Sequence, residues 1–474
     1  MAALTTCALV AETGSPPTAG HRTGTTVRVS ANQVLGEFDN PAWYQNQSGP
    51  NSPLGPRDLD LVDALDVRVA RVWLLPRGYY DAATYRYDFD FAGSEGSGTY
   101  RYLDQVAGYA QRLMVNLGEC PPEILTLDDP GECRRVLRDG LIAYKRRYPS
   151  IRYVELFNEP DKTWDVPEGH WRGLTVDDYY AWYRIGYSVV DDINRELHPK
   201  TPLRIGGPAA ASFDEDFLRG FLDRYADDSN PDKRLDFISY HQYQSAADPA
   251  AVGTEKQTVR GWLAERRLDP DTRVFVTEYG VFPGDAGGRS SSEDLLVQAA
   301  AMQTLAYYYQ TSGMDAAMHW VFRHPSNERK SMFTGADGRV HPYFNLVRMQ
   351  RRMKTRRVAA TSDGLSPAGL GVNALATADS SGVAVLATNY QWTTGHAAHD
   401  VSMEVDLPAR LAHRQLRLDR YLIDSTTSND AHDPASSDLQ RVERRTVTVG
   451  ATVHTTFRLE PNGLSLVVLT PMSG

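Results

Sequence analysis

Short runs of β-branched and aromatic residues alternate along this chain with longer segments of helical spacing. Eight such strand-and-helix units follow one another from about residue 33 to residue 355. Strands that are separated by helices form a parallel sheet, and eight units predict a closed (β/α)8, or TIM, barrel. The predicted barrel strands cover residues 33–39, 67–74, 113–117, 151–159, 203–208, 235–243, 273–280 and 316–322.

The pattern changes after residue 356, where β-patterned segments separated by turns replace the helices. These segments predict an accessory antiparallel β-sandwich over residues 357–474. Residues 26–30 form a short strand with no helix after it, which we expect to join the sandwich. The prediction is therefore an α/β chain with a flexible segment at residues 1–25, this strand, a barrel at residues 31–356 and the sandwich.

Composition excludes some classes of function. The 474 residues carry a formal net charge of −10, and an acidic balance argues against a nucleic-acid partner. No apolar run is long enough to span a membrane. The apolar start of the chain lacks the basic region of a signal peptide, so the compartment stays open between cytoplasm and secretion with a processed N-terminus.

Three cysteines, Cys7, Cys120 and Cys133, show neither a C-x-x-C pair nor a Cys/His cluster, so the sequence predicts no zinc site. Cys120 and Cys133 bracket a proline-containing loop. A disulfide between them and two free thiols fit the sequence equally well.

Two predicted barrel strands end in a glutamate. Residues 151–161 read I-R-Y-V-E-L-F-N-E-P-D, and Pro160, which lacks an N–H donor, stops the strand at or just before Glu159. The seventh strand reads R-V-F-V-T-E-Y-G and delivers Glu278 to its own end. The carboxyl ends of barrel strands form the active site, and glycoside hydrolysis requires two carboxyl groups. We therefore predict Glu159 as acid/base and Glu278 as nucleophile.

The two roles require different surroundings. We expect Arg71, near the end of the second strand, and Tyr243, near the end of the sixth, to donate to Glu278 and keep it ionised. We expect Glu159 to keep its proton because it has fewer donors and is repelled by Glu278.

Further residues are placed by strand alternation. Trp73 has the same parity as the second-strand arginine, and His241 has the same parity as the sixth-strand tyrosine, so all four can face the barrel interior. Asn158 neighbours Glu159, so both reach the site only if the strand end bends. Trp320, at the end of the eighth strand, is a candidate sugar platform. Each of these residues also has a purely structural interpretation, as an ion pair, an interior histidine or barrel filling.

The loop of residues 77–100 contains seven aromatic residues, and their alternation with charged residues from 85 to 91 indicates a small hairpin. A long loop on this face is either functional or a self-packed flap. Arg77, Lys162 and Arg323 follow predicted strand ends and are candidates for reading a uronate carboxylate, although such residues are more often solvated or ion-paired.

The segments V-E-L-F-N-E-P-D, R-I-G-G-P-A, D-F-I-S-Y-H-Q-Y and V-F-V-T-E-Y-G resemble clan A glycoside hydrolases. They are most similar to glycoside hydrolase family 39, the β-xylosidase and α-L-iduronidase family. The resemblance implies a retaining double displacement at Glu159 and Glu278. Where family 39 xylosidases tend to follow the second-strand arginine with Phe-His, this chain has Val72 and Trp73, so families 30, 51 and 5 remain alternatives.

The expected activity is hydrolysis of an oligosaccharide or polysaccharide, a β-xyloside or a related plant or microbial glycan, without cofactor or metal. One rival is a catalytically inactive carbohydrate-binding barrel. Another is a different barrel enzyme, such as a lyase or a metal-dependent hydrolase, which no metal-ligand spacing in the sequence supports. The oligomeric state stays open.

Overall fold

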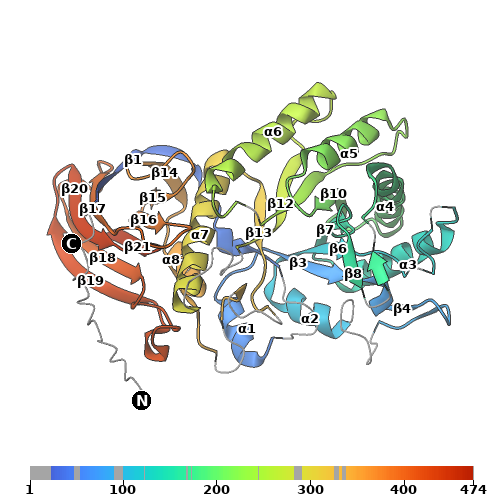
Figure 1. The fold of residues 1–474 in the computed structure, drawn as a ribbon, viewed down its shortest axis with the longest axis horizontal. Helices are drawn as coiled ribbons and strands as arrows, with labels where there is room; N and C mark the ends of the chain where they lie inside the picture. Colours follow the sequence, from blue (N-terminus) through green and yellow to red (C-terminus); the bar gives the residue numbers. More distant parts are fainter. Residues whose placement is uncertain are drawn as a thin grey trace, which may run out of the picture.

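Eight parallel strands close into a barrel in the computed structural model, in the order β10-β11-β12-β13-β2-β3-β6-β7 (Figure 1). The structure describes residues 23–46, 54–89, 100–121, 123–126, 128–166, 169–171, 173–243, 245–281, 291–324, 330–333 and 338–472. The barrel strands are β2 (Tyr44–Asn46), β3 (Val69–Leu74), β6 (Arg112–Leu117), β7 (Ile151–Leu156), β10 (Arg204–Ala210), β11 (Phe237–Gln242), β12 (Arg273–Tyr279) and β13 (Ala316–His319). The predicted barrel is confirmed.

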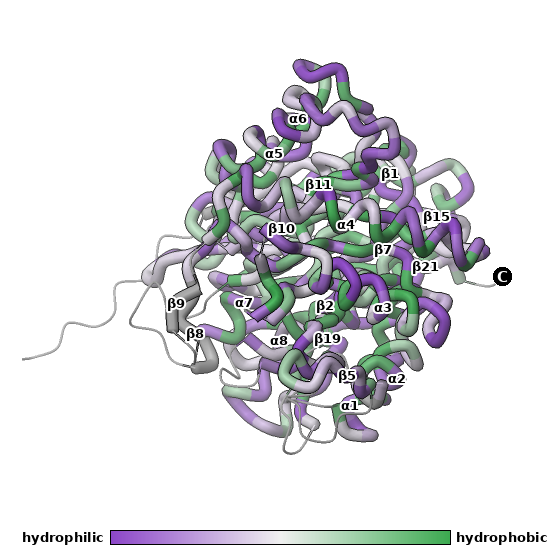
Figure 2. The backbone as a smooth tube through the Cα atoms, turned by 90° about the vertical axis from the view of Figure 1, so that its right-hand side faces the viewer, coloured by the Kyte–Doolittle hydropathy of each residue, from purple (hydrophilic) through white to green (hydrophobic). Residues whose placement is uncertain are grey.

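Helices surround the barrel and cover it with their apolar residues. They are α1 (Pro56–Asp63), α2 (Tyr100–Tyr109), α3 (Gly131–Arg147), α4 (Val176–Leu197), α5 (Glu215–Asp227), α6 (Val252–Glu265), α7 (Ser291–Ser312) and α8 (Pro342–Gln350). Most have one apolar face, whereas α7 and α8 are buried nearly all round. Thr175 caps α4 by accepting from the backbone N–H of Asp178. Hydrophobic positions gather in the middle of the molecule and hydrophilic ones along the outer helices (Figure 2).

Strand alternation divides the barrel interior into layers. At the amino ends of the strands, an apolar cluster includes Val69, Met114, Tyr153, Phe237 and Phe275. Because successive side chains on one face are two residues apart, the next interior positions on β3, β6 and β7 are polar. The barrel therefore carries an apolar floor and a polar layer directly above it.

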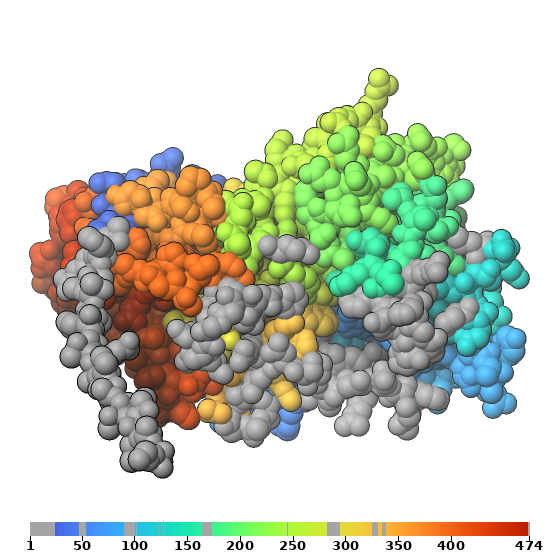
Figure 3. Space-filling model, viewed as in Figure 1, coloured from blue at the N-terminus to red at the C-terminus, as the bar shows by residue number. Residues whose placement is uncertain are grey.

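The C-terminal domain is a curled nine-stranded sheet in the order β19-β18-β21-β16-β15-β14-β1-β17-β20, and it forms the left part of the molecule (Figure 3). The strands are β1 (Thr23–Glu37), β14 (Arg356–Ser362), β15 (Gly371–Asp379), β16 (Gly382–Tyr390), β17 (His399–Asp406), β18 (Gln415–Ile423), β19 (Gln440–Thr448), β20 (Thr452–Leu459) and β21 (Leu464–Pro471). The accessory antiparallel β-sandwich predicted here is confirmed, with β1 as the one strand that pairs in parallel, with β17, among the described residues.

The prediction of a first barrel strand at residues 33–39 is wrong. Residues 33–37 continue β1, which pairs antiparallel with β14 and parallel with β17. The apolar Val34 and Leu35 suggested a buried strand, but both are about half exposed (48% and 49%). The true first barrel strand, β2, has only three residues and is polar. Of the segment predicted to be flexible, residues 1–22 lie outside the described residues, together with Cys7, and residues 23–25 begin β1.

Helices α7 and α8 lie between the barrel and the sheet and pack against β15, β16 and β18 (Figure 1). A buried hydrogen-bond contact crosses the same boundary, with Nδ1 of His341 3.0 Å from Oδ1 of Asp430. The side-chain amide of Asn345 donates to the backbone oxygens of Ser428 and Ser437. Within the described residues, no helix is both long and apolar enough to cross a membrane.

Candidate active site

The end of β7 bends, and this brings two neighbouring side chains to the same place. Phe157 and Glu159 have positive φ angles, 63° and 46°, in the left-handed region that non-glycine residues seldom adopt. Hydrogen bonds from their backbone N–H groups to the oxygens of Leu117 and Ala209, both 2.9 Å, hold this conformation. Asn158 and Glu159 therefore both face the carboxyl end of the barrel, as the bent strand end predicted.

Glu278 lies between two donors. Nη1 of Arg71 is 2.6 Å from its Oε1, and the Tyr243 hydroxyl donates to its Oε2 over 2.7 Å. Burial, and then the charge of Glu278, raises the pKa of Tyr243 well above its ordinary value, so this hydroxyl stays a donor. Arg71 also donates to Oδ1 of Asn158, over 2.8 Å. These are the two donors that the sequence predicted for Glu278.

Glu159 is not the donor-poor group that we predicted. Its Oε1 is 2.8 Å from Nδ1 of His241, and its Oε2 accepts from Nζ of Lys162 over 3.3 Å. Burial raises the pKa of Glu159, but His241 and then Lys162 outweigh burial, so the pKa lies below its ordinary value. In the free protein this carboxyl is therefore ionised at neutral pH, and the prediction that isolation keeps its proton is wrong.

Trp73 and Trp320 meet edge to face, with ring centroids 6.1 Å apart. The Arg71 guanidinium lies 5.1 Å from the Trp73 ring centroid. Both indoles are partly exposed, so they form an aromatic wall beside the two carboxylates. The structure thus brings all eight predicted site residues into one region.

Sequence reasoning missed three residues that surround Arg71. Glu155 accepts from Nε of Arg71 over 2.7 Å and from Nδ2 of Asn116 over 3.1 Å. Asn46 accepts from Nη1 of Arg71 over 3.2 Å and donates to the backbone oxygen of Thr277 over 2.8 Å. Glu155, Asn116 and Asn46 are all fully buried. The signal was present for two of them, because a charged or amide residue interrupts the apolar runs V-E-L and V-N-L.

The aromatic loop contains a small hairpin, but it pairs β4 (Tyr80–Asp81) with β5 (Arg86–Tyr87) and so begins before the 85–91 segment from which it was predicted. It packs on α3: the Tyr80 and Tyr87 hydroxyls donate to Glu132 and Asp139. Within the described residues this loop is a self-packed flap. Residues 90–99, including Phe91, lie outside the described residues.

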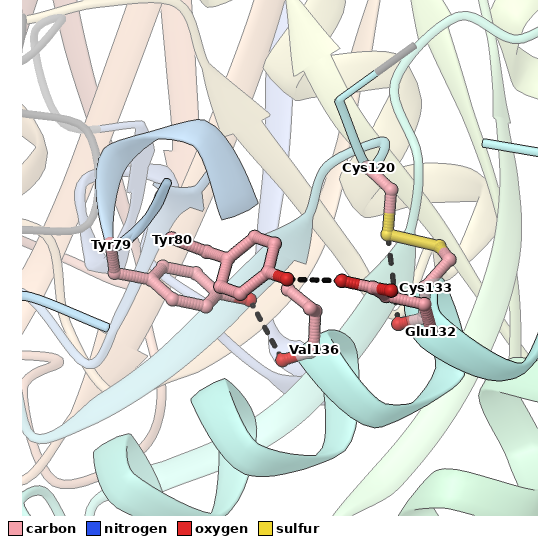
Figure 4. The surroundings of a disulfide bond; sticks show 6 residues. All are labelled: Tyr79, Tyr80, Cys120, Glu132, Cys133 and Val136. Atoms are coloured by element: carbon pink, nitrogen blue, oxygen red, sulfur yellow. Dashed lines mark hydrogen bonds between the residues drawn. A yellow bond between two sulfur atoms is a disulfide. The ribbon is translucent and has the colours of Figure 1, made fainter. Parts of the chain in front are cut away.

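A disulfide joins Cys120, in the loop after β6, to Cys133, in the first turn of α3 (Figure 4). Tyr79 and Tyr80 reach the same helix beside it, so the flap and the loop after β6 are both fixed to the first turns of α3. Of the two alternatives left open by the sequence, the structure has the disulfide.

The three candidate uronate readers have different surroundings. Nη1 of Arg323 is 2.9 Å from Oδ2 of Asp58, and Lys162 is paired with Glu159. Arg77 is exposed beyond the end of β3. Two of the three charges are thus matched by carboxylates of the protein itself, which weakens a uronate-reading role for them.

Oxygens of Glu159 and Glu278 and a nitrogen of His241 lie within 4.8 Å of one another. Spacing alone would admit a metal ion. However, Nδ1 of His241 is at hydrogen-bond distance from Glu159, and the guanidinium of Arg71 contacts Glu278. A cation beside a ligand oxygen repels a second cation. The arrangement suits proton transfer better than metal binding.

The fold and these residues define a (β/α)8 barrel that presents two neighbouring glutamates at the ends of its fourth and seventh strands, with a β-sheet domain attached. No family model matches the sequence, and no curated protein matches it. Solved structures do match the fold, and they extend over nearly the whole chain.

A bacterial orthologue of human α-L-iduronidase has a TM-score of 0.74 at 16% identity, covering 96% of this chain and 85% of that one. A glycoside hydrolase family 39 enzyme from Xanthomonas axonopodis pv. citri has a TM-score of 0.69 at 16% identity, covering 97% and 100%. A β-xylosidase from Caulobacter crescentus CB15 has a TM-score of 0.69 at 16% identity, covering 94% and 100%. The resemblance to family 39 enzymes is therefore confirmed at the level of the fold.

Proposed function

We propose that this protein is a retaining glycoside hydrolase in which Glu278 is the nucleophile and Glu159 the acid/base. The observation that carries the proposal is the approach of the two carboxylates, whose nearest oxygens lie within 4.8 Å of each other. Retaining enzymes hold their carboxyl groups about 5–5.5 Å apart, whereas inverting enzymes leave about 6.5–9.5 Å for a water molecule. The short separation favours direct attack by a carboxylate.

In the first step, Glu278 attacks the anomeric carbon while the glycosidic oxygen takes a proton from Glu159. Arg71 and Tyr243 each hold one oxygen of Glu278, and this fixes the direction of attack. For this step Glu159 carries the proton, and its Oε1 lies 2.8 Å from Nδ1 of His241.

In the second step, Glu159 is a carboxylate again and takes a proton from water, which releases the sugar from Glu278 with its original anomeric configuration. The lowered pKa of Glu159 in the free protein suits this basic role. The edge-to-face pair of Trp73 and Trp320 offers ring surface to the C–H faces of the sugar.

The substrate in this proposal is a β-xyloside or a related plant or microbial glycan. Solved structures of similar fold include a β-xylosidase, a bacterial iduronidase orthologue and an α-L-arabinofuranosidase from Thermotoga maritima. The paired charges of Lys162 and Arg323 favour a neutral sugar over a uronate. Trp73 stands where xylosidases of this type tend to have histidine, so the contact of that histidine with a sugar hydroxyl is replaced here by an aromatic surface.

The test is a panel of aryl β-xyloside, β-glucoside, β-galactoside and α-L-arabinoside with the wild type, Glu159→Ala and Glu278→Ala. We expect one substrate to turn over and Glu278→Ala to be inactive. Azide should rescue the two variants with glycosyl azides of opposite anomeric configuration. Loss of the acid/base should lower turnover about 10²–10⁴-fold.

The control is Glu255→Gln, which changes a buried glutamate on α6 that is bonded to Tyr240 and Gln242 on the outer side of the barrel. It should retain activity. Normal turnover by Glu278→Ala would overturn the assignment, and an inverted product from the wild type would overturn the retaining mechanism.

A further inference from the structure

Glu155 is a carboxylate that has no role in the proposed double displacement. It is fully buried in the middle of β7, four residues before Glu159. Donors from two neighbouring strands meet its Oε2, with Arg71 on β3 at 2.7 Å and Asn116 on β6 at 3.1 Å. It lies above the apolar floor formed by residues such as Tyr153 and below the strand ends, where it cannot touch a sugar.

Arg71 is shared between this carboxylate and the nucleophile. Its Nη1 is 2.6 Å from Glu278 while its Nε is 2.7 Å from Glu155. Burial lowers the pKa of Arg71, but the charges of Glu155 and Glu278 outweigh burial and raise it, so the guanidinium keeps its charge. A single buried cation thus serves two buried anions, and Glu159 adds a third carboxylate a few ångströms away.

The barrel interior therefore contains more negative than positive charge, even when Lys162 at the rim is included. Such a site favours an additional proton. Among the described residues, the group placed to take it is the pair of His241 and Glu159, because their Nδ1 and Oε1 atoms are 2.8 Å apart. When this proton passes from nitrogen to oxygen, an N–H bond breaks, an O–H bond forms, and the imidazolium and the carboxylate both become neutral.

We propose that Glu155 is a positioning residue of the hydrolysis: a fixed buried anion that, through Arg71, keeps this shared proton on the His241–Glu159 pair at neutral pH. The inference rests on the proposed function and deepens it, because the shared proton is the one that the leaving group must receive. Glu155 also sets the position of Arg71, and hence the orientation of Glu278.

Among the described residues, the charged and titratable groups that face the pair or its neighbours are Arg71, Tyr102, Glu119, Glu155, Asp161, Lys162, Tyr179, Tyr243 and Glu278. Of the carboxylates among them, only Glu155 is fully buried and out of reach of a substrate. A change at Glu155 therefore alters the buried charge and the support of Arg71 without removing a contact to the sugar.

The experiment compares the pH dependence of kcat/KM for the wild type, Glu155→Gln and Glu255→Gln. Glutamine keeps the shape of the side chain and removes its charge. Removing an anion lets the pair release its proton more easily, so the basic limb of Glu155→Gln should move to lower pH by about one unit. Glu255→Gln removes another buried carboxyl group, 4% exposed, from the outer side of the barrel and should keep the wild-type profile.

A second measurement needs no turnover. In protein labelled at histidine, the ring-carbon shifts of His241, recognised by their absence in His241→Asn, follow the protonation of the pair. The pair in Glu155→Gln should lose its proton about one pH unit earlier than in the wild type. This readout is independent of hydrolysis, so failure of the proposed function and failure of this inference are distinguishable.

Glu155→Asp is a second variant, which keeps the test possible if Glu155→Gln does not fold. It keeps the charge but withdraws it from Arg71, so we expect a smaller displacement in the same direction. If kcat/KM falls in Glu155→Gln while the basic limb and the His241 titration stay where the wild type has them, Glu155 is only a structural residue and the inference is refuted. Movement of the basic limb or of the His241 titration to higher pH would refute the inference as well.

Discussion

Replacement of Arg71 by methionine tests whether the barrel interior is held together by charge balance. The side chain is 1% exposed, and its guanidinium bonds to Glu155 and Glu278 at 2.7 and 2.6 Å. Methionine fills a similar volume but leaves two buried carboxylates without a cation. Removing one partner of a buried ion pair typically costs about 3–5 kcal/mol, and we expect a loss of unfolding free energy of this size at pH 7.5.

The loss should depend on pH in a defined direction. In the wild type, burial raises the pKa of Glu155, but Arg71 together with His241, Thr277 and Ser239 outweighs burial and brings the folded-state pKa below its ordinary value. This carboxyl therefore contributes stability above its unfolded pKa and loses it as pH falls through the folded pKa. Without Arg71, burial leaves the folded-state pKa of Glu155 raised. Protonation of Glu155 at lower pH therefore reduces the destabilisation of the variant. The difference should shrink by about 1.4 kcal/mol per pH unit for each proton taken up.

Urea denaturation at pH 5.5 and 7.5 measures this difference. Tryptophan fluorescence follows the barrel, because seven of the eight tryptophans lie between residues 43 and 320. Arg146→Met is the matched control, since Arg146 on α3 pairs with Glu196 at 2.8 Å but is 60% exposed, and it should change little. A loss at Arg71 that matches this control, or one that does not shrink at pH 5.5, would refute the reasoning.

Two further perturbations address the rim of the site and the covalent link. In Lys162→Met the cation beside Oε2 of Glu159 is lost, so the pKa of Glu159 should rise. Because Lys162 is about half exposed, we expect the basic limb of the pH profile of kcat/KM to move up by only about half a pH unit. A basic limb that stays in place or moves to lower pH would contradict this. Replacing Cys120 and Cys133 by serine opens a loop of sequence separation 13 and should lower the unfolding free energy by about 3 kcal/mol. A thermal melt that is the same for this variant, the oxidised wild type and the reduced wild type would contradict that prediction.

Residues that end a strand identified the two candidate catalytic glutamates in the sequence. Pro160 follows Glu159 and Gly280 follows Glu278 closely, so both carboxylates mark strand ends that a parallel barrel gathers on one face. The same logic failed for the first strand, because a polar segment of three residues has no period to detect. Chain pattern identifies elements that are long and amphipathic, and β2 is neither.

Periodicity also tells which face a residue occupies, but not which residues meet across the barrel. Arg71 and Glu155 lie 84 positions apart, and their contact depends on the register of β3, β6 and β7. The donors to Glu159 were missed for a related reason. Lys162 reaches back over a turn closed by the Lys162 N–H and the Glu159 oxygen, 3.1 Å apart, and this turn exists because the end of β7 bends.

The layering of the barrel links its stability to its chemistry. Above the apolar floor, each strand has few interior positions left before its end, so the ionic layer of Arg71 and Glu155 lies directly beneath Glu278. A guanidinium cannot be tolerated there without carboxylates, and a carboxylate at the strand end cannot be oriented without the guanidinium. Glu278, the proposed nucleophile, is thus one member of the charge balance that lets the barrel core fold, and substitutions in this layer should change folding and the pH dependence of activity together.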